Sequence, residues 1–516
     1  ALRRLVEDAP GNAGLRELLV RRQLLAGDVE GAERELRALA ELHPDEPERA
    51  LDVVRLIAVR DGVEPALAET ARLIEGADGA EAAFPFTLAR AQLLIDADRQ
   101  AEAETLLEDA VAQLGTSEPA LEARIALARI ALADGRTERV AALVGEVLEE
   151  DPDLADGLVL RGRLALMADD YEGAIADLRE ALSNEPDRVD ALSLLARAHR
   201  LNGNGQLAGE RLADAAEASG HAPDTTLSYA QHLVRDGKAE FASDVVTEAL
   251  KRHPDSRLLL EAAARLRLRL GDWAGAEAVS ERLAELDAAG EACSADLAER
   301  IAAAALIGQE RYDEGLSRLL GPAATDPAGA AGALAPADLA AAVQTYLRAD
   351  RAGQARALLD STIEQNPQNA LARRLRGTLL ANEGEFEQAE EDLLAAIEAD
   401  PGDATSHIAL ARLRGATGGA EAAEETLRAG IAETGSPDLR FSLGGLLERR
   451  GDLEGAIAEY RAVHEARPDF DAAANNLASL IADTDAGEAE IAEAARIARR
   501  LRDSEIPHFR DTYGWL

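Results

Sequence analysis

Apolar residues along this chain recur with the period of an α-helix, and the apolar stretches end at prolines or polar breaks. In residues 153–186, two such stretches flank a short polar break at Ala168-Asp169-Asp170, and Pro186 closes the second stretch. Proline ends a helix because it has no backbone N–H and its φ angle is fixed. The pattern therefore predicts two helices that are joined by a tight turn.

The same unit recurs along the chain. Small residues occupy fixed slots, with Gly162 in the first predicted helix and Ala174 and Ala181 in the second. Glycines such as Gly384 fall at the turn between helices, where a left-handed conformation ends the first helix. The closing prolines lie 34 residues apart in three pairs, which are Pro10 and Pro44, Pro152 and Pro186, and Pro367 and Pro401. A fixed period of this length indicates an array in which each unit buries its apolar face against its neighbours.

These features resemble the tetratricopeptide repeat (TPR), a helix–turn–helix unit with small residues at fixed slots and a closing proline. The best copies are 153–186, 368–401 and 436–468. The resemblance implies an all-α TPR solenoid that winds into a right-handed superhelix, with a concave face lined mainly by first helices. We expect about 14 full repeats between residues 11 and 506. A partial repeat is expected at each end.

Residues 321–338 are rich in Gly, Ala and Pro, which is typical of a loop or hinge. We therefore expect one sub-array over 1–320 and a second over 339–516. The first residues, "ALRRLVEDAP", read as the closing helix of a repeat, and the last, "DTYGWL", read as the opening of another. The sequence is expected to be a window cut from a longer array.

Composition narrows the possible partners. Asp and Glu number 97 against 55 Lys and Arg, which gives a net charge of −42. A balance this acidic repels nucleic acid and anionic lipid. Lys238 and Lys251 are the only two lysines, so nearly every basic residue is an arginine. The apolar runs are too short for a membrane-spanning helix, which needs about 20 residues.

No arrangement of residues predicts catalysis. The eight histidines include no pair at i,i+4 spacing, and Cys293 is the only cysteine. These spacings predict no metal site and no disulfide. We therefore expect no enzyme activity and no cofactor in this chain.

An arginine row is the sharpest candidate for a binding site. Its members directly follow the small slot of the first helix, and in the family this position faces the concave side. They are Arg129, Arg163 and Arg197, at intervals of 34 residues, and then Arg265 and Arg412. Acidic residues, among them Asp156 and Asp190, lie two helical turns earlier on the same face. Either the arginines grip an acidic peptide or a carboxylated glycan, or they only neutralise these carboxylates in pairs that contribute about 0–1 kcal/mol each.

The resulting hypothesis is a non-enzymatic scaffold that binds protein partners, or an anionic polysaccharide, in its concave groove. The Ala-rich, arginine-over-lysine style of the repeats is similar to large TPR proteins of bacterial envelope, secretion and exopolysaccharide systems, including the PEP-CTERM/exosortase system. This similarity implies a periplasmic location, with the cytoplasm as the alternative. Two other functions stay open: the substrate-binding portion of a larger enzyme such as a glycosyltransferase, and a structural subunit of a larger complex. The oligomeric state is not predicted.

Overall fold

The computed structural model describes residues 2–288, 295–321, 334–484, 487–502, 504 and 506–516. Every regular element among these residues is helical, so the all-α prediction is confirmed. The chain divides into two compact units, unit 1 from Ala1 to Pro186 and unit 2 from Asp187 to Leu516. The expected hinge at 321–338 falls largely on residues outside the described ranges. The division into 1–320 and 339–516 therefore stays a prediction.

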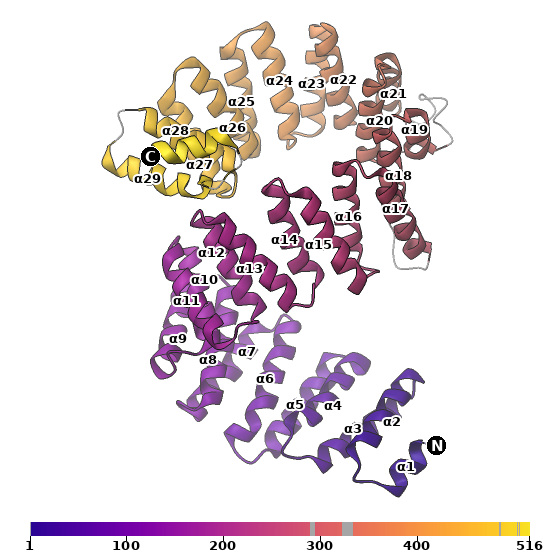
Figure 1. The fold of residues 1–516 in the computed structure, drawn as a ribbon, viewed down its shortest axis with the longest axis vertical. Helices are drawn as coiled ribbons and strands as arrows, with labels where there is room; N and C mark the ends of the chain where they lie inside the picture. Colours follow the sequence, from indigo (N-terminus) through magenta and orange to yellow (C-terminus); the bar gives the residue numbers. More distant parts are fainter. Residues whose placement is uncertain (1, 289–294, 322–333, 485–486, 503, 505) are drawn as a thin grey trace. The chain divides into compact units, whose positions relative to one another are not determined.

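Unit 1 is a stack of antiparallel helix pairs in chain order (Figure 1). It begins with α1 (Leu2–Asp8). The first helices of its pairs are α2 (Ala13–Leu25), α4 (Pro47–Asp61), α6 (Ala80–Asp96), α8 (Glu118–Ala133) and α10 (Ala155–Met167). The second helices are α3 (Val29–Leu42), α5 (Val63–Gly76), α7 (Gln100–Leu114), α9 (Thr137–Glu150) and α11 (Tyr171–Asn184).

Unit 2 continues the same alternation of first and second helices (Figure 1). Its first helices are α12 (Val189–Leu201), α14 (Pro223–Arg235), α16 (Arg257–Leu270), α18 (Ala295–Gly308), α20 (Pro336–Arg348), α22 (Ala370–Glu383), α24 (Ala404–Thr417), α26 (Pro437–Arg450) and α28 (Asp471–Asp483). Its second helices are α13 (Gly205–Ala218), α15 (Ala239–Arg252), α17 (Trp273–Ala288), α19 (Tyr312–Leu320), α21 (Ala352–Gln365), α23 (Phe386–Ala399), α25 (Ala420–Thr434), α27 (Leu453–Ala466) and α29 (Glu488–Ala498). The 3₁₀ turn η2 (Arg499–Leu501) and α30 (Pro507–Trp515) follow.

The small slots lie where the two helices of a pair approach each other. A Cβ atom on Gly162 would lie 2.9 Å from Cγ of Leu178, and one on Gly377 would lie equally close to Cγ of Leu393. On the second helices, Ala174 and Ala181 are fully buried. Small residues recur in these slots because larger ones would force the helices apart.

The turns and helix starts follow equally local rules. The predicted turn glycines adopt the left-handed conformation, with φ of 73° at Gly27 and 84° at Gly384. The next residue is often an aspartate that caps the second helix. The Oδ1 atom of Asp28 accepts a hydrogen bond from the N–H of Gly31 at 3.0 Å, and Asp272, which follows Gly271, does the same for Gly275 at 3.0 Å. Each cap satisfies a backbone donor that the helix itself leaves free.

Filling a small slot should destabilise the array. Gly162→Val would press three extra carbons against Leu178 and Ala174, and overpacking of this kind costs about 1–3 kcal/mol. Denaturant unfolding followed by far-UV circular dichroism should show a lower midpoint for this variant. Gly145→Ala on α9 is the control, because no heavy atom lies within 4 Å of its new Cβ. The free energy of unfolding of the control should rise by about 0.5–1 kcal/mol. An equal loss of stability in both variants would contradict the role of the slot.

Candidate functional site on the first helices

One exposed position follows the buried slot residue on every first helix of unit 1. The slot holds a small residue on α6, α8 and α10, and a valine (Val20 and Val54) on α2 and α4. The slot residue packs against the second helix, so the next residue, about 100° further round the helix, points away from that contact. We name these side chains the first-helix row of unit 1. Its members are Arg21 on α2, Arg55 on α4, Gln92 on α6, Arg129 on α8 and Arg163 on α10, and all five are exposed.

The two arginines predicted for the row in unit 1 differ in whether a carboxylate pairs with them. Arg129 donates to Asp156 at 2.6 Å, and this pair bridges α8 and α10. Both side chains are accessible to solvent, so the pair contributes at most about 1 kcal/mol. Arg163 has no carboxylate within ion-pair distance among the residues that the structure describes. Arg129 is therefore neutralised within the protein, whereas Arg163 is available to a partner.

The predicted residues of unit 2 also differ in whether they have an ion-pair partner. Asp190 accepts from Nε of Arg188, a residue outside the row, at 2.8 Å. Arg265 lies 3.3 Å from Glu261 one turn earlier and is 80% exposed. Arg197 and Arg412 are exposed, and within the described ranges neither is paired with a carboxylate.

Two members of the row, Arg21 and Arg55, are absent from the sequence prediction. They are separated by 34 residues, the same interval that identified the others. The longer repeat at 79–117 shifts the register between Arg55 and Arg129, which hides the continuity. Arg55 pairs with Glu48 at 2.8 Å and Asp52 at 2.7 Å. Arg21 is exposed, and no carboxylate pairs with it in the described part of the chain.

Arg412 lines a groove of about 770 Å³ over helices α24 to α28. We name this surface the C-terminal groove. Gly415 and Gly445 contribute no side chains to it, so it is hollowed at these positions. Arg449 on α26 is its second arginine, and Phe441 is its one partly exposed aromatic residue. Its lining residues are Ile408, Ala411, Arg412, Gly415, Ala420, Ala423, Leu427, Phe441, Ser442, Gly445, Leu446, Glu448, Arg449, Tyr460 and Asn476.

An aromatic cluster supports the floor of the C-terminal groove. The Phe441 ring lies 5.5 Å from the ring of Tyr460 and 4.9 Å from that of Phe470, both in tilted geometry. Tyr460 is only 1% exposed, and its hydroxyl donates to Oε2 of Glu448 at 2.9 Å. Gly444 makes room for this ring, because a Cβ there would lie 2.7 Å from Cε1 of Tyr460. Burial, with a further contribution from the Glu448 carboxylate, raises the pKa of Tyr460 to about 12.

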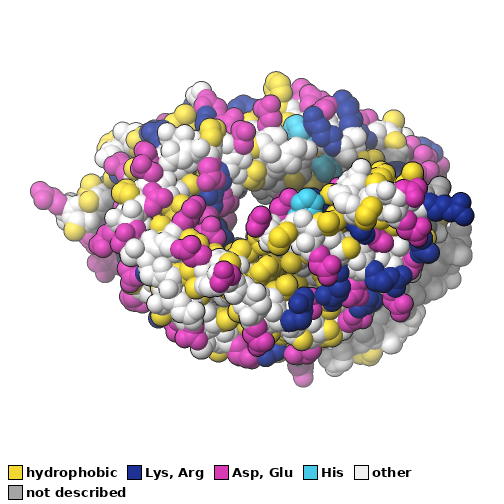
Figure 2. Space-filling model, turned by 90° about the horizontal axis from the view of Figure 1, so that it is seen from below, with side chains coloured by type: hydrophobic (Ala, Val, Ile, Leu, Met, Phe, Trp, Pro, Cys, Tyr) yellow, Lys and Arg dark blue, Asp and Glu magenta, His cyan; other side chains and the backbone are white. Residues whose placement is uncertain are grey.

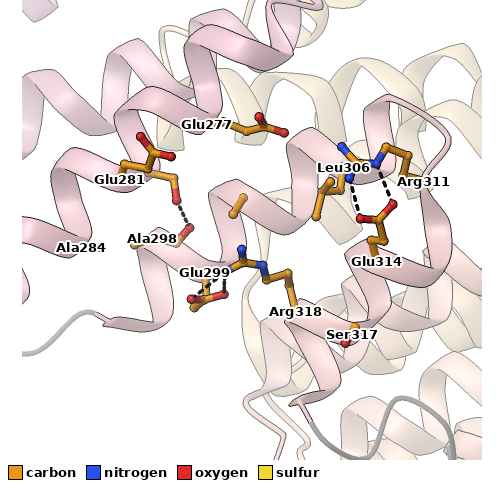
Figure 3. Close-up of a pocket in the computed structure, with 12 residues that line it drawn as sticks. Glu277, Glu281, Ala284, Ala298, Glu299, Leu306, Arg311, Glu314, Ser317 and Arg318 are labelled. Atoms are coloured by element: carbon orange, nitrogen blue, oxygen red, sulfur yellow. Dashed lines mark hydrogen bonds and ion pairs between the residues drawn. The ribbon is translucent and has the colours of Figure 1, made fainter.

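A second pocket, of about 500 Å³ over α17 to α19, differs from this groove because its cations are consumed internally (Figure 3). Arg311 pairs with Glu314 at 2.5 Å, and Arg318 pairs with Glu299 at 2.9 Å. Ser280 donates to the carbonyl oxygen of Ala298 at 2.8 Å. The pocket presents surplus carboxylates to a ligand, so it is unsuited to an anion.

The face of the molecule drawn in Figure 2 intermixes charges of both signs. Figure 2 shows carboxylates spread over one face, with arginines lying among them. Within the described residues, no group of three or more His, Cys, Asp or Glu side chains is placed to hold a metal ion. None of the described helices is long and apolar enough to cross a membrane.

Tyr460 should titrate late in alkaline solution. An unfolded tyrosine has a pKa of about 10, so the folded state holds the proton more tightly between about pH 10 and 12. The stability from this group is fully present below pH 10 and is lost as the pH rises through that window. Ultraviolet absorbance should show a late tyrosinate phase that shrinks in Tyr460→Phe. Burial also raises the pKa of Tyr346, so part of the phase should remain.

The control for this titration is Tyr312→Phe, which removes one chromophore without touching the C-terminal groove. An unchanged late phase in Tyr460→Phe would contradict the assignment.

Comparison with known proteins supports the repeat assignment. A family model described as tetratricopeptide repeat matches residues 159–223, 340–404 and 408–469. The third match contains most of α24 and all of α25 to α27, the helices that carry most of the C-terminal groove. A search of curated proteins found no match. The three matched segments are tetratricopeptide repeats, as the 34-residue period predicts, within an all-helical chain.

Proposed function

We propose that this protein is a non-enzymatic scaffold that binds a partner protein through the exposed face of its first helices. Tetratricopeptide repeats generally mediate protein–protein interaction, and this supports the proposal at the level of the fold. The support at the level of residues is the first-helix row, which presents one long polar side chain from each successive repeat of unit 1.

The observation that carries the proposal is that Arg21 and Arg163 are exposed and have no ion-pair partner among the described residues. The chain carries 97 carboxylates against 55 cations, so internal partners are abundant. Most other arginines of unit 1 use them, as Arg37 does with Glu69 at 2.7 Å. A guanidinium left free in such a chain is available for a carboxylate on a partner, which it can hold with two parallel hydrogen bonds.

We also propose that the scaffold works in the bacterial envelope, on the periplasmic side, in a secretion or exopolysaccharide system. The support is the style of the repeats, which are rich in alanine and use arginine in place of lysine. An anionic polysaccharide is the second partner class that fits a row of arginines.

Reversing the two unpaired charges should release the partner. The full-length chain would be immobilised and exposed to native lysate, with captured proteins quantified by mass spectrometry. Arg21→Glu combined with Arg163→Glu should reduce recovery of the specific partner at least about tenfold, because two charge-assisted contacts become repulsions.

The matched control is Arg34→Glu combined with Arg179→Glu. These two arginines are exposed on the second helices of the same repeats, so the change in net charge is identical. The control should retain the partner. Equal loss in both double variants, or retention in both, would contradict binding through the row.

The envelope proposal has its own measurement. Fractionation of the native cell, followed by immunoblotting, should place the protein with periplasmic or envelope markers. Recovery with cytoplasmic markers alone would reject this location and leave the scaffold proposal standing.

A further inference from the structure

The C-terminal groove contains two arginines that the protein itself does not neutralise. Arg412 and Arg449 both line the groove, are exposed, and have no carboxylate within ion-pair distance among the described residues. Adjacent arginines that point elsewhere are paired. Arg414 donates to Glu390 at 2.8 Å, and Arg440 donates to Glu459 at 3.0 Å. Among the arginines of α24 to α27, the two that have no carboxylate partner in the described part of the chain therefore both lie on the hollowed surface.

The rest of the groove mixes polar and apolar residues, with Ser442, Glu448 and Asn476 among the polar ones. Ile408 contributes aliphatic surface, and the partly exposed Phe441 ring is held in place by Tyr460 and Phe470. A surface of this kind buries an aliphatic or aromatic side chain. A polymer of sugar acids carries no aliphatic or aromatic side chain to pack on Ile408 and Phe441, so a protein segment uses this part of the lining better.

Small residues continue the row on both sides of the groove. The positions that correspond to Arg412 are Thr378 on α22, Gly445 on α26 and Ser479 on α28. These short side chains leave room for a chain to pass in either direction. The arrangement suits an internal segment of a protein, which must enter and leave the groove, better than a chain end.

We propose that the C-terminal groove binds an extended, internal segment of the partner protein. The segment carries one Asp or Glu, whose carboxylate is held by Arg412 and Arg449, and an apolar side chain nearby that packs on Phe441. The inference deepens the proposed scaffold function by naming the chemistry of the partner at this site. It is independent of the first-helix row of unit 1, so the two can fail separately.

The test uses the full-length chain and a defined set of fluorescein-labelled dodecapeptides, acetylated and amidated so that no terminal carboxylate is present. Each peptide has Glu, Gln or Lys at its centre, with either Leu and Phe or Ser at the flanking positions. Fluorescence anisotropy should show binding of Glu peptides with apolar flanks, at least about tenfold tighter than their Gln counterparts. Lys peptides should not bind.

Variants of the chain locate the binding. Arg412→Gln and Arg449→Gln should each remove most of the preference for Glu over Gln. Gly445→Leu should block the groove and abolish binding of every peptide, with circular dichroism confirming that the helices remain. Arg428→Gln is the matched control, since Arg428 lies on the second helix of the same repeat and outside the groove. It should bind as the unaltered chain does.

Three results would overturn the inference. The first is that no peptide of the set binds in a Glu-dependent way. The second is that Arg428→Gln weakens binding as much as Arg412→Gln does. The third is that an oligomer of galacturonic acid binds through Arg412 and Arg449 while the peptides do not, which would assign the groove to a glycan. Loss of the inference in any of these ways leaves the partner-capture experiment on Arg21 and Arg163 as the separate test of the scaffold.

Discussion

The close approach of the two helices within each pair is the contact on which the other features depend. Gly162 against Leu178, and Gly444 against Tyr460, set how near the first helix lies to the second. Because each unit buries its apolar face only against its partner helix and its neighbours, stability accumulates from these local contacts. The slot also orients the first helix, since fixing one residue against the second helix fixes which residue faces outward. The binding face is thus a consequence of packing.

Charge neutralisation then decides which outward residues are available. Ion pairs between consecutive repeats are frequent, as in Arg49 with Glu17 at 2.7 Å and Arg461 with Glu493 at 3.0 Å. Pairs at such partly exposed positions add little stability each. They do, however, remove arginines from the set that a partner can contact. The row of unit 1 and the C-terminal groove matter because they contain arginines that are not removed in this way.

The helix pairs and the turn at Gly384 were predictable because they depend on residues close together in sequence. Which arginines of the row are paired was not predictable, because Arg129 reaches Asp156 only when α8 and α10 stack. Arg21 was missed because an insertion breaks the 34-residue count. The C-terminal groove was beyond sequence reasoning, because it arises from glycines on two helices and from an aromatic cluster that spans three. Local periodicity fixes the scaffold, whereas contacts between repeats select its usable surface.

The net charge of −42 limits what the groove can accept. At physiological ionic strength, charges separated by more than about 8 Å are largely screened, so the distant carboxylates repel an acidic segment only weakly. Within that distance, Arg412 and Arg449 set the local field around the Phe441 ring. A single carboxylate in a neutral or basic segment gains this attraction without bringing several charges near Glu448. A strongly acidic run would meet that carboxylate as well, so the groove favours segments in which the acidic residue stands alone.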